Sequence, residues 1–263
     1  MDLTSTDRRL ALVTGASRLN GIGAATCRAL AAAGNDVVFS HWLRYDQQFP
    51  WGASLGDPAT LLGELHALGA RAEAIEIDHS LPDTPATLFD LVNERLGPVS
   101  ILVNNAAYST QDGYDALDAA TLDAHYAVNV RGMALLSVEF ARRWTGTSGG
   151  RIINMTSGQS RGPMPTELAY GMSKGAVEAF TVSFADGVAD LGITVNAVNP
   201  GPTDTGWIDD DLKAALLPLS PFGRLGQPED AAKVIVYLVG PDGGWITGQV
   251  IHSEGGFRRG APR

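Results

Sequence analysis

Three side chains within residues 157–174 have the types and the spacing to move a proton at a carbonyl group. Tyr170 and Lys174 stand four residues apart, so a helix that begins near Ala169 places both on one face, one turn apart. A tyrosine ionises near pH ~10, but a cation about 4 Å away contributes roughly 4 kcal/mol at an effective dielectric of ~20. We therefore expect Lys174 to lower the pKa of Tyr170 toward neutral pH.

The third side chain, Ser157, lies thirteen residues before Tyr170, at the end of an apolar run that begins at Arg151. A tyrosine and a lysine four apart often form only an aromatic stem and a solvated amine. A serine at the tip of a buried strand, followed by a loop and a helix with that pair, resembles the short-chain dehydrogenase/reductase family. The resemblance implies that Ser157, Tyr170 and Lys174 act on a carbonyl or a secondary alcohol beside a nicotinamide cofactor.

Composition bounds the class of protein. A chain of 263 residues with 44% hydrophobic and 18% charged residues can bury a substantial core, and we expect one domain over residues 1–263. The net charge of −10 argues against a nucleic-acid or membrane surface. No signal peptide or apolar span is present, so a cytoplasmic location is expected. The one cysteine, Cys27, lies in an alanine-rich helical pattern that predicts core packing, and no metal site is expected.

The chain begins with a strand, a glycine turn and a helix. Arg9–Thr14 is apolar and too short for a helix, Gly15–Gly23 is the turn, and Ile22–Ala33 is the helix. Glycines let backbone amides approach a pyrophosphate, and the helix N-terminus supplies partial positive charge. A second strand, Asp36–Ser40, follows. This unit predicts a dinucleotide site.

The turn departs from the family pattern Thr-Gly-x-x-x-Gly-x-Gly. Two extra residues separate Thr14 and Gly15 from Gly21 and Gly23. A lengthened surface turn costs little, so the phosphate loop should still work. Some enoyl reductases of the superfamily also have a longer loop here, which keeps reduction of a C=C bond as an alternative. Those enzymes usually space the tyrosine and lysine more widely than four residues.

The end of the second strand bears on the cofactor. An NAD-preferring protein places a carboxylate about twenty residues past the glycines, but His41 and Trp42 stand there. Arg44 follows, and Arg18 lies in the phosphate loop, so a 2′-phosphate would meet cations. We expect NADP(H) to be favoured, with NAD(H) possible; the other interpretation is that both arginines only face solvent.

Strands and helices alternate along the rest of the chain. The expected helices are 59–68, 84–96, 121–143, one from about 169 and one from 226, and the expected strands are 72–77, 101–107, 151–157, 194–198 and 246–251. Seven strands alternating with helices predict an α/β, Rossmann-like, doubly wound parallel sheet in a single domain. Ligands bind such sheets at the carboxyl ends of the strands.

The resemblance assigns further residues. Asn129 would bend the long helix and hold a water that connects Lys174 to solvent, and Asn104 would bridge neighbouring strands. Asp78 would accept from the adenine amino group, with a helix-capping role as the alternative. The set implied to contact the cofactor is Gly15, Ser17, Arg18, Gly21, Ile22, Gly23, His41, Trp42, Asp78, Asn104, Ala106, Tyr170, Lys174, Pro200, Gly201, Thr203 and Thr205.

Two segments fall outside the regular alternation. The aromatic stretch Trp42–Pro58 is expected to pack near the adenosine end of the cofactor or to form an interface, in preference to covering the substrate. Gly206–Arg224 is expected to be the mobile substrate cover. The length of the helix 121–143 suggests a homo-oligomer, a dimer or tetramer. A non-catalytic NADP-sensing regulator and a structural subunit remain as alternatives to a carbonyl reductase.

Overall fold

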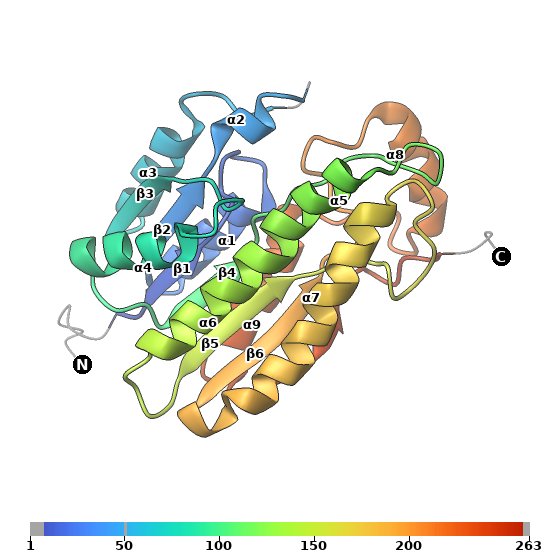
Figure 1. The fold of residues 1–263 in the computed structure, drawn as a ribbon. Helices are drawn as coiled ribbons and strands as arrows, with labels where there is room; N and C mark the ends of the chain where they lie inside the picture. The colour runs from blue at the N-terminus through green and yellow to red at the C-terminus, as the bar shows by residue number, and fades with distance from the viewer. Residues whose placement is uncertain (1–7, 50–51, 260–263) are drawn as a thin grey trace.

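Seven short strands form one parallel sheet in the computed structural model, which describes residues 8–49 and 52–259 (Figure 1). Their order is β3-β2-β1-β4-β5-β6-β7, and every neighbouring pair is parallel. The strands are β1 (Leu10–Val13), β2 (Asp36–His41), β3 (Ala72–Glu76), β4 (Ile101–Asn104), β5 (Gly150–Met155), β6 (Ile193–Asn199) and β7 (Val250–His252). The predicted doubly wound sheet is confirmed.

Helices cover both faces of this sheet (Figure 1). They are α1 (Ile22–Ala32), α2 (Leu43–Asp46), α3 (Asp57–Ala67), α4 (Thr84–Arg95), α5 (Ala119–His125), α6 (Met133–Arg143), α7 (Leu168–Gly187), α8 (Asp210–Leu216) and α9 (Pro228–Val239), with 3₁₀ turns at Ala189–Leu191 and Leu217–Leu219. Every residue of β1, β4, β5 and β6 is buried. Strands buried on both faces read as continuous apolar runs, which is why the sequence revealed them.

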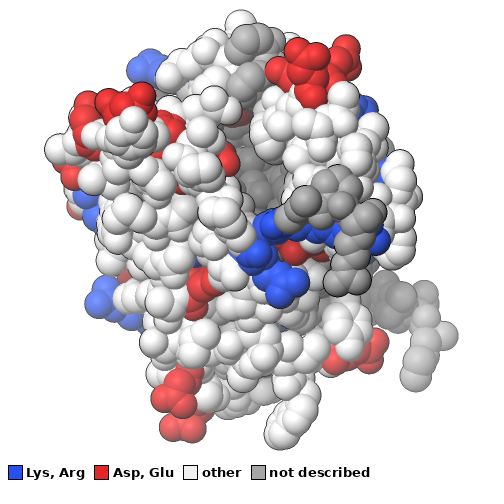
Figure 2. All heavy atoms as spheres, turned by 90° about the vertical axis from the view of Figure 1, so that its right-hand side faces the viewer, with Lys and Arg blue, Asp and Glu red and all other residues white. Residues whose placement is uncertain are grey.

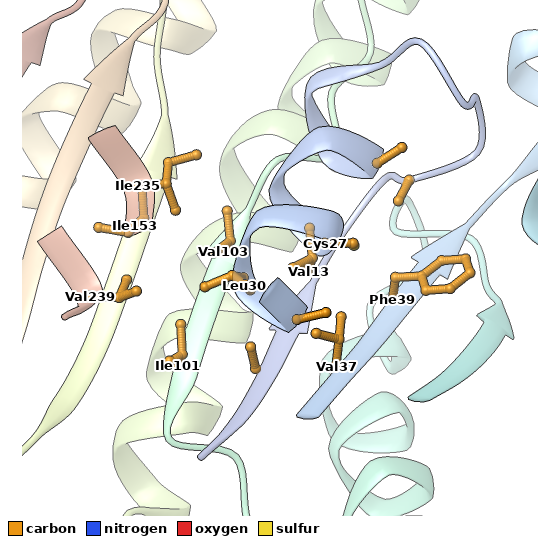
Figure 3. Packing of buried hydrophobic residues seen from close by; sticks show 14 of the residues in the cluster. Val13, Cys27, Leu30, Val37, Phe39, Ile101, Val103, Ile153, Ile235 and Val239 are labelled. Carbon is orange, nitrogen blue, oxygen red and sulfur yellow. The ribbon is translucent and has the colours of Figure 1, made fainter. Parts of the chain in front are cut away.

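Two apolar cores lie on opposite faces of the sheet. On one face, Leu30 of α1 and Ile235 of α9 pack against Val13 and Val103 (Figure 3). On the other face, α4, α6 and α7 pack against the alternate residues of the same strands. Cys27 belongs to the first core and has no exposed surface, which confirms its predicted place, and burial raises the pKa of its thiol.

Two predicted elements have other bounds than expected, and the segment expected as a substrate cover has little regular structure. The expected helix 121–143 consists of α5, a π-helical segment Tyr126–Gly132 and α6. Segment 206–224 contains only the short helix α8 and a 3₁₀ turn. The last strand is limited to Val250–His252, because Gly248 adopts a positive φ of 69° that no strand residue shares.

The chain order places a crevice at the centre of the sheet. From β1 the strands proceed to β2 and β3, and the chain then returns to β4 on the opposite side of β1. Ligands of open parallel sheets bind at such a switch point, outside the carboxyl ends of the strands. Within the described residues, no helix has both the length and the apolar composition needed to cross a bilayer.

Candidate active site

A cavity of about 1070 Å³ opens at the carboxyl ends of the strands. It is visible as a hollow in the surface in Figure 2. Every residue predicted to contact the cofactor lines this cavity except Asn104. Ser157, Tyr170 and Lys174 line it as well, whereas Asn129 does not. Predicted cofactor-binding residues that are up to 190 positions apart in the sequence, such as Gly15 and Thr205, therefore line the same cavity.

The glycine turn is shaped by contacts that leave no room for side chains. A Cβ atom on Gly15 would lie 2.6 Å from the Ala106 Cα atom, and Gly15 has a φ of 73°. A Cβ on Gly23 would lie 2.7 Å from the Gly15 carbonyl oxygen and 2.8 Å from the Asn105 amide nitrogen. The hydroxyl of Thr14 accepts from the backbone amides of Asn105 and Ala106, both at 3.0 Å. The turn is thus locked against the exit of β4, with the N-terminus of α1 facing the cavity.

The two extra residues of the turn form a tight turn of their own, and Gly15 and Gly23 keep their close contacts. The amide of Gly21 donates to the Arg18 carbonyl at 3.1 Å, which closes a tight turn, and Leu19 packs against the core. The Arg18 guanidinium pairs with Asp46 at 3.1 Å and donates to the Thr205 carbonyl at 2.8 Å. Arg18 therefore spans the cavity between α2 and the segment after β6, and its charge is already matched by a carboxylate.

No acid stands at the end of β2 where an NAD-binding protein would place one. His41 and Trp42 line the cavity there, and the Trp42 amide donates to the Ser17 hydroxyl at 3.1 Å. The exposed Arg44 guanidinium lies 5.4 Å from the centroid of the Trp42 ring and makes no ion pair within the described part of the chain. Of the two predicted arginines, Arg44 is the one left available for an anion.

The described part of the aromatic segment packs beside the loop that follows β4. The Tyr45 hydroxyl donates to the Ser109 carbonyl at 3.0 Å and accepts from the Ser109 amide at 2.9 Å. Its ring packs against Tyr108 and Phe49, with centroids 5.3 and 5.2 Å away. Tyr45, Asp46, Gln48 and Phe49 also line the cavity. Trp51, part of the same predicted segment, lies outside the described residues.

Asp78 lies in a local turn and Asn104 bridges two strands. The carboxylate of Asp78 accepts from the Ser80 amide at 2.8 Å in a local turn. Helix α4 begins only at Thr84, so the helix-capping interpretation of Asp78 is wrong. The Asn104 amide donates to the Asn154 side chain at 2.9 Å, which bridges β4 and β5 as predicted. Asn105 lines the cavity and Asn104 does not, so the contact of Asn104 with the cofactor stays a prediction.

Ser157, Tyr170 and Lys174 meet at the inner end of the cavity. The Lys174 Nζ atom lies 5.5 Å from the centroid of the Tyr170 ring and donates to the Met155 carbonyl at 2.8 Å. Burial lowers the pKa of Lys174 to about 8. Burial is also the main cause that raises the pKa of Tyr170, with a smaller rise from the Glu167 carboxylate; a hydrogen bond with Ser157 opposes both.

The expectation that Lys174 lowers the pKa of Tyr170 is therefore wrong for this arrangement. The ammonium faces the tyrosine ring and a β5 carbonyl, and burial is the main cause that raises the pKa of Tyr170. A phenol with a raised pKa stays protonated at neutral pH. Tyr170 is thus suited to donate a proton to an oxygen that gains negative charge.

Asn129 and Asp112 position these groups from outside the cavity. The side-chain amide of Asn129 accepts from the Tyr108 amide at 2.7 Å and donates to the Tyr108 carbonyl at 2.8 Å and to the Ser173 hydroxyl at 2.9 Å. The Asp112 carboxylate accepts from the first amides of α7, Leu168 at 2.6 Å and Ala169 at 3.1 Å. Asn129 itself lies in the π-helical segment that interrupts the predicted long helix, and its predicted water contact stays a prediction.

Comparison with known proteins gives the family. The family model for enoyl-(acyl carrier protein) reductases matches residues 15–258. The chain is 48% identical over 260 residues to an uncharacterized oxidoreductase, YjdA, of Bacillus subtilis, covering 98% of this chain and all of the relative. The chain belongs to the short-chain dehydrogenase/reductase family.

Two more members of the short-chain dehydrogenase/reductase family show how far the likeness extends. A 3-oxoacyl-[acyl-carrier-protein] reductase of Synechocystis is 32% identical, over 97% of this chain and 99% of the relative. A Burkholderia cenocepacia short-chain dehydrogenase, solved in complex with NADP, superposes with a TM-score of 0.83 at 34% identity. That superposition covers 95% of this chain and 97% of the other. The protein is accordingly an oxidoreductase of this family.

Sequence reasoning missed several residues of this short-chain dehydrogenase/reductase site. Asp112 carried no signal, because it caps a helix 56 residues away in the chain. Tyr45 was noted only as part of an aromatic stretch. The C-terminal Glu254 and Arg259 were not considered, although Arg259 lines the cavity.

Proposed function

We propose that the protein transfers a hydride reversibly between NADP(H) and a carbonyl or secondary alcohol, with Tyr170 as the proton donor in reduction. The observation that carries this proposal is that Ser157, Tyr170 and Lys174 line the same cavity as the glycine turn, with burial keeping the Tyr170 pKa raised and its phenol protonated. A carbonyl oxygen placed there can accept from both hydroxyls while negative charge develops on it.

The residues present fit a dinucleotide cofactor. The turn lines the cavity through Gly15, Ser17, Arg18, Gly21 and Gly23, and a Cβ atom at Gly15 or Gly23 would collide with neighbouring protein atoms, so the backbone there can lie close to a ligand. Pro200, Gly201, Thr203 and Thr205 line the opposite side. The nicotinamide, when bound, supplies or accepts the hydride.

The chain itself supplies the proton chemistry. Tyr170 donates its phenolic proton to the substrate oxygen, and Ser157 holds that oxygen with a second hydrogen bond. Lys174, with a pKa lowered by burial to about 8, is a cation beside the Tyr170 ring, 5.5 Å from its centroid. Asn129 keeps the Tyr108 backbone and Ser173 in place beside them.

NADP(H) is the proposed cofactor in preference to NAD(H). No carboxylate lies at the end of β2, where it would repel a 2′-phosphate, and Arg44, which has no ion pair among the described residues, stands 5.4 Å from the ring of Trp42 in the cavity lining. The relative from Burkholderia cenocepacia is complexed with NADP, which agrees with this choice.

Steady-state oxidation of NADPH and NADH with a panel of ketones, aldehydes and 3-oxoacyl thioesters tests the proposal. We expect turnover of at least one carbonyl, with kcat/KM higher for NADPH than for NADH. NADPH binding without turnover on any carbonyl would contradict the proposal and favour a non-catalytic sensor. Absence of nucleotide binding would favour a structural subunit.

Reduction of a C=C bond is the second candidate, supported by the lengthened glycine turn and by the description of the matching family model. The spacing of four between Tyr170 and Lys174 favours the carbonyl. Offering a 3-oxoacyl thioester and the corresponding enoyl thioester to the same preparation separates the two reactions.

The proposed enzyme is one catalytic domain over the whole chain, with Gly206–Arg224 as its substrate cover. Trp207, Leu212 and Leu216 of that segment line the cavity, which supports the cover. We also propose a homo-oligomer, because Met172 and Val182 of α7 are more than half exposed. Sedimentation equilibrium would give the number of subunits.

A further inference from the structure

The C-terminal segment after β7 forms one wall of the cavity. The backbone amide of Arg258 donates to the Leu219 carbonyl at 2.9 Å, which fixes this segment to the proposed substrate cover. On the other side, the Arg259 guanidinium covers Gly158, since a Cβ atom built there would collide with it. Gly158 directly follows Ser157. A cation therefore lies next to the serine that would hold the substrate oxygen.

The Arg259 charge is only partly balanced. Arg259 donates to Glu254, and Arg161 lies 3.9 Å from the same carboxylate, so two guanidinium groups share one acid. Glu254 has a further commitment, because its carboxylate also accepts from the Asn199 amide at 2.7 Å. Lys and Arg side chains gather at one border of the hollow in Figure 2. An excess of one positive charge remains in this cluster.

Part of the guanidinium has no hydrogen-bond partner. The Nη1 atom of Arg259 is buried and lacks an acceptor among the described residues. A buried donor without a partner destabilises a fold by about 1–3 kcal/mol. The Arg259 pKa is lowered mainly by burial, and the nearby Arg161 lowers it further.

The cavity lining carries one acid, Glu167, and one cation, Arg259, near the proposed reacting groups. Glu167 lies close enough to Tyr170 to raise its pKa, and its carboxylate makes no hydrogen bond within the described residues. Arg259 also lines the cavity, against Gly158, the residue after Ser157. A substrate whose carbonyl rests on Ser157 and Tyr170 therefore has a cation close to its oxygen. An anionic group of that substrate is favoured near Arg259.

We propose that Arg259 binds a carboxylate of the substrate, so that the enzyme acts on aldehydes or ketones that carry an acid group. This inference rests on the proposed carbonyl reduction and adds the substrate class to it. Arginine suits this role because its planar donors match a carboxylate in two parallel hydrogen bonds. Glu254 holds the guanidinium in place against Gly158, where the Arg259 side chain lines the cavity.

The test compares two substrates that differ in charge, 4-formylbenzoate and its methyl ester, with NADPH. In the wild-type enzyme we expect kcat/KM for the acid to exceed that for the ester by about 10-fold or more. Arg259→Gln should lower kcat/KM for the acid by about 10- to 100-fold and leave the ester within about threefold. Arg258→Gln, which removes an exposed neighbouring arginine that does not line the cavity, is the matched control and should change neither.

Binding without turnover separates this inference from the proposed function. Calorimetry with benzoate and benzamide, which share size and shape, should show tighter binding of the anion to the wild type and loss of that difference in Arg259→Gln. If this holds while no carbonyl is reduced, the reductase assignment fails and the anion site stands. Equal binding of the two ligands, equal kcat/KM for acid and ester, or equal losses for both substrates in Arg259→Gln would overturn the inference.

Discussion

Asp112 caps the helix that carries the proposed proton donor: its carboxylate accepts from the Leu168 amide, two residues before Tyr170, at 2.6 Å. Removing a cap costs about 1–2 kcal/mol, and Tyr170 lies in the first turn that this cap fixes. We predict that Asp112→Ala lowers the melting temperature by about 2–8 °C. We also predict that Asp112→Ala lowers kcat about 10-fold, because a small displacement of Tyr170 from its reacting position slows proton transfer.

Asp118→Ala is the control for this prediction. Asp118 caps α5 through the Thr121 amide at 2.8 Å, and that helix carries none of the proposed reacting groups. Its loss should lower stability by a similar amount without an equal fall in kcat. Unchanged kcat in Asp112→Ala would show that the first turn of α7 holds its position without the cap.

Burial of Lys174 predicts a pH-dependent stability in the free protein. Its pKa is about 8 when folded and near 10.5 when unfolded, so the unfolded chain binds more protons between these values. The contribution of Lys174 to the free energy of unfolding therefore rises with pH through this window and is lost as pH falls through 8. From pH 7.5 to 9.5 the change is about 2 kcal/mol.

Urea unfolding of the wild type and of Lys174→Met at both pH values isolates this contribution. The variant has no titrating group at position 174. From pH 7.5 to 9.5 its free energy of unfolding should therefore rise by about 2 kcal/mol less than that of the wild type. Parallel pH profiles for the two proteins would mean that Lys174 keeps an ordinary pKa in the fold.

Arg44 is predicted to select the cofactor. The other candidate, Arg18, is paired with Asp46 at 3.1 Å, whereas Arg44 makes no ion pair within the described residues. Arg44→Ala should raise KM for NADPH about 10-fold, the effect of losing one charge-assisted hydrogen bond, and leave KM for NADH unchanged. A rise of equal size for both cofactors would instead indicate a general disturbance of α2.

The double hydrogen bond between Tyr45 and Ser109 is predicted to hold the wall of the cavity. Tyr45→Phe keeps the ring packing and removes the hydroxyl that both donates to and accepts from the Ser109 backbone. We expect a loss of about 1–3 kcal/mol in the free energy of unfolding and a rise in KM for the carbonyl substrate. Chemical denaturation and steady-state kinetics check this, and wild-type values for both would show that water replaces the hydroxyl.

The sequence predicted the sheet and most of the cavity because both depend on local patterns. Apolar runs such as Leu10–Val13 mark buried strands, and glycines such as Gly15 and Gly23 are required by close backbone contacts. Residues that follow the strands directly, such as Ser157, must meet at one edge of a parallel sheet. The predicted set therefore lines one cavity.

The helix cap, the Tyr170 pKa and the side-chain partners within the site could not be predicted, because they depend on contacts between distant segments or on desolvation. Nothing local to Asp112 indicates that it caps α7, and nothing in the spacing of Tyr170 and Lys174 shows that burial outweighs their attraction. Asn129 was identified as important, but its partners, Tyr108 and Ser173, come from other segments. The pairing of Arg18 with Asp46 likewise needed the placement of α2.

Replacement of the phenol by a ring of the same shape tests the central claim most directly. Tyr170→Phe keeps the packing around Lys174 and removes the proton donor, so the single-turnover rate of NADPH oxidation with the best carbonyl substrate should fall by about 100- to 10,000-fold. The dissociation constant for NADPH should stay within about twofold of the wild type. A single-turnover rate close to that of the wild type would contradict the assignment of Tyr170 as the proton donor.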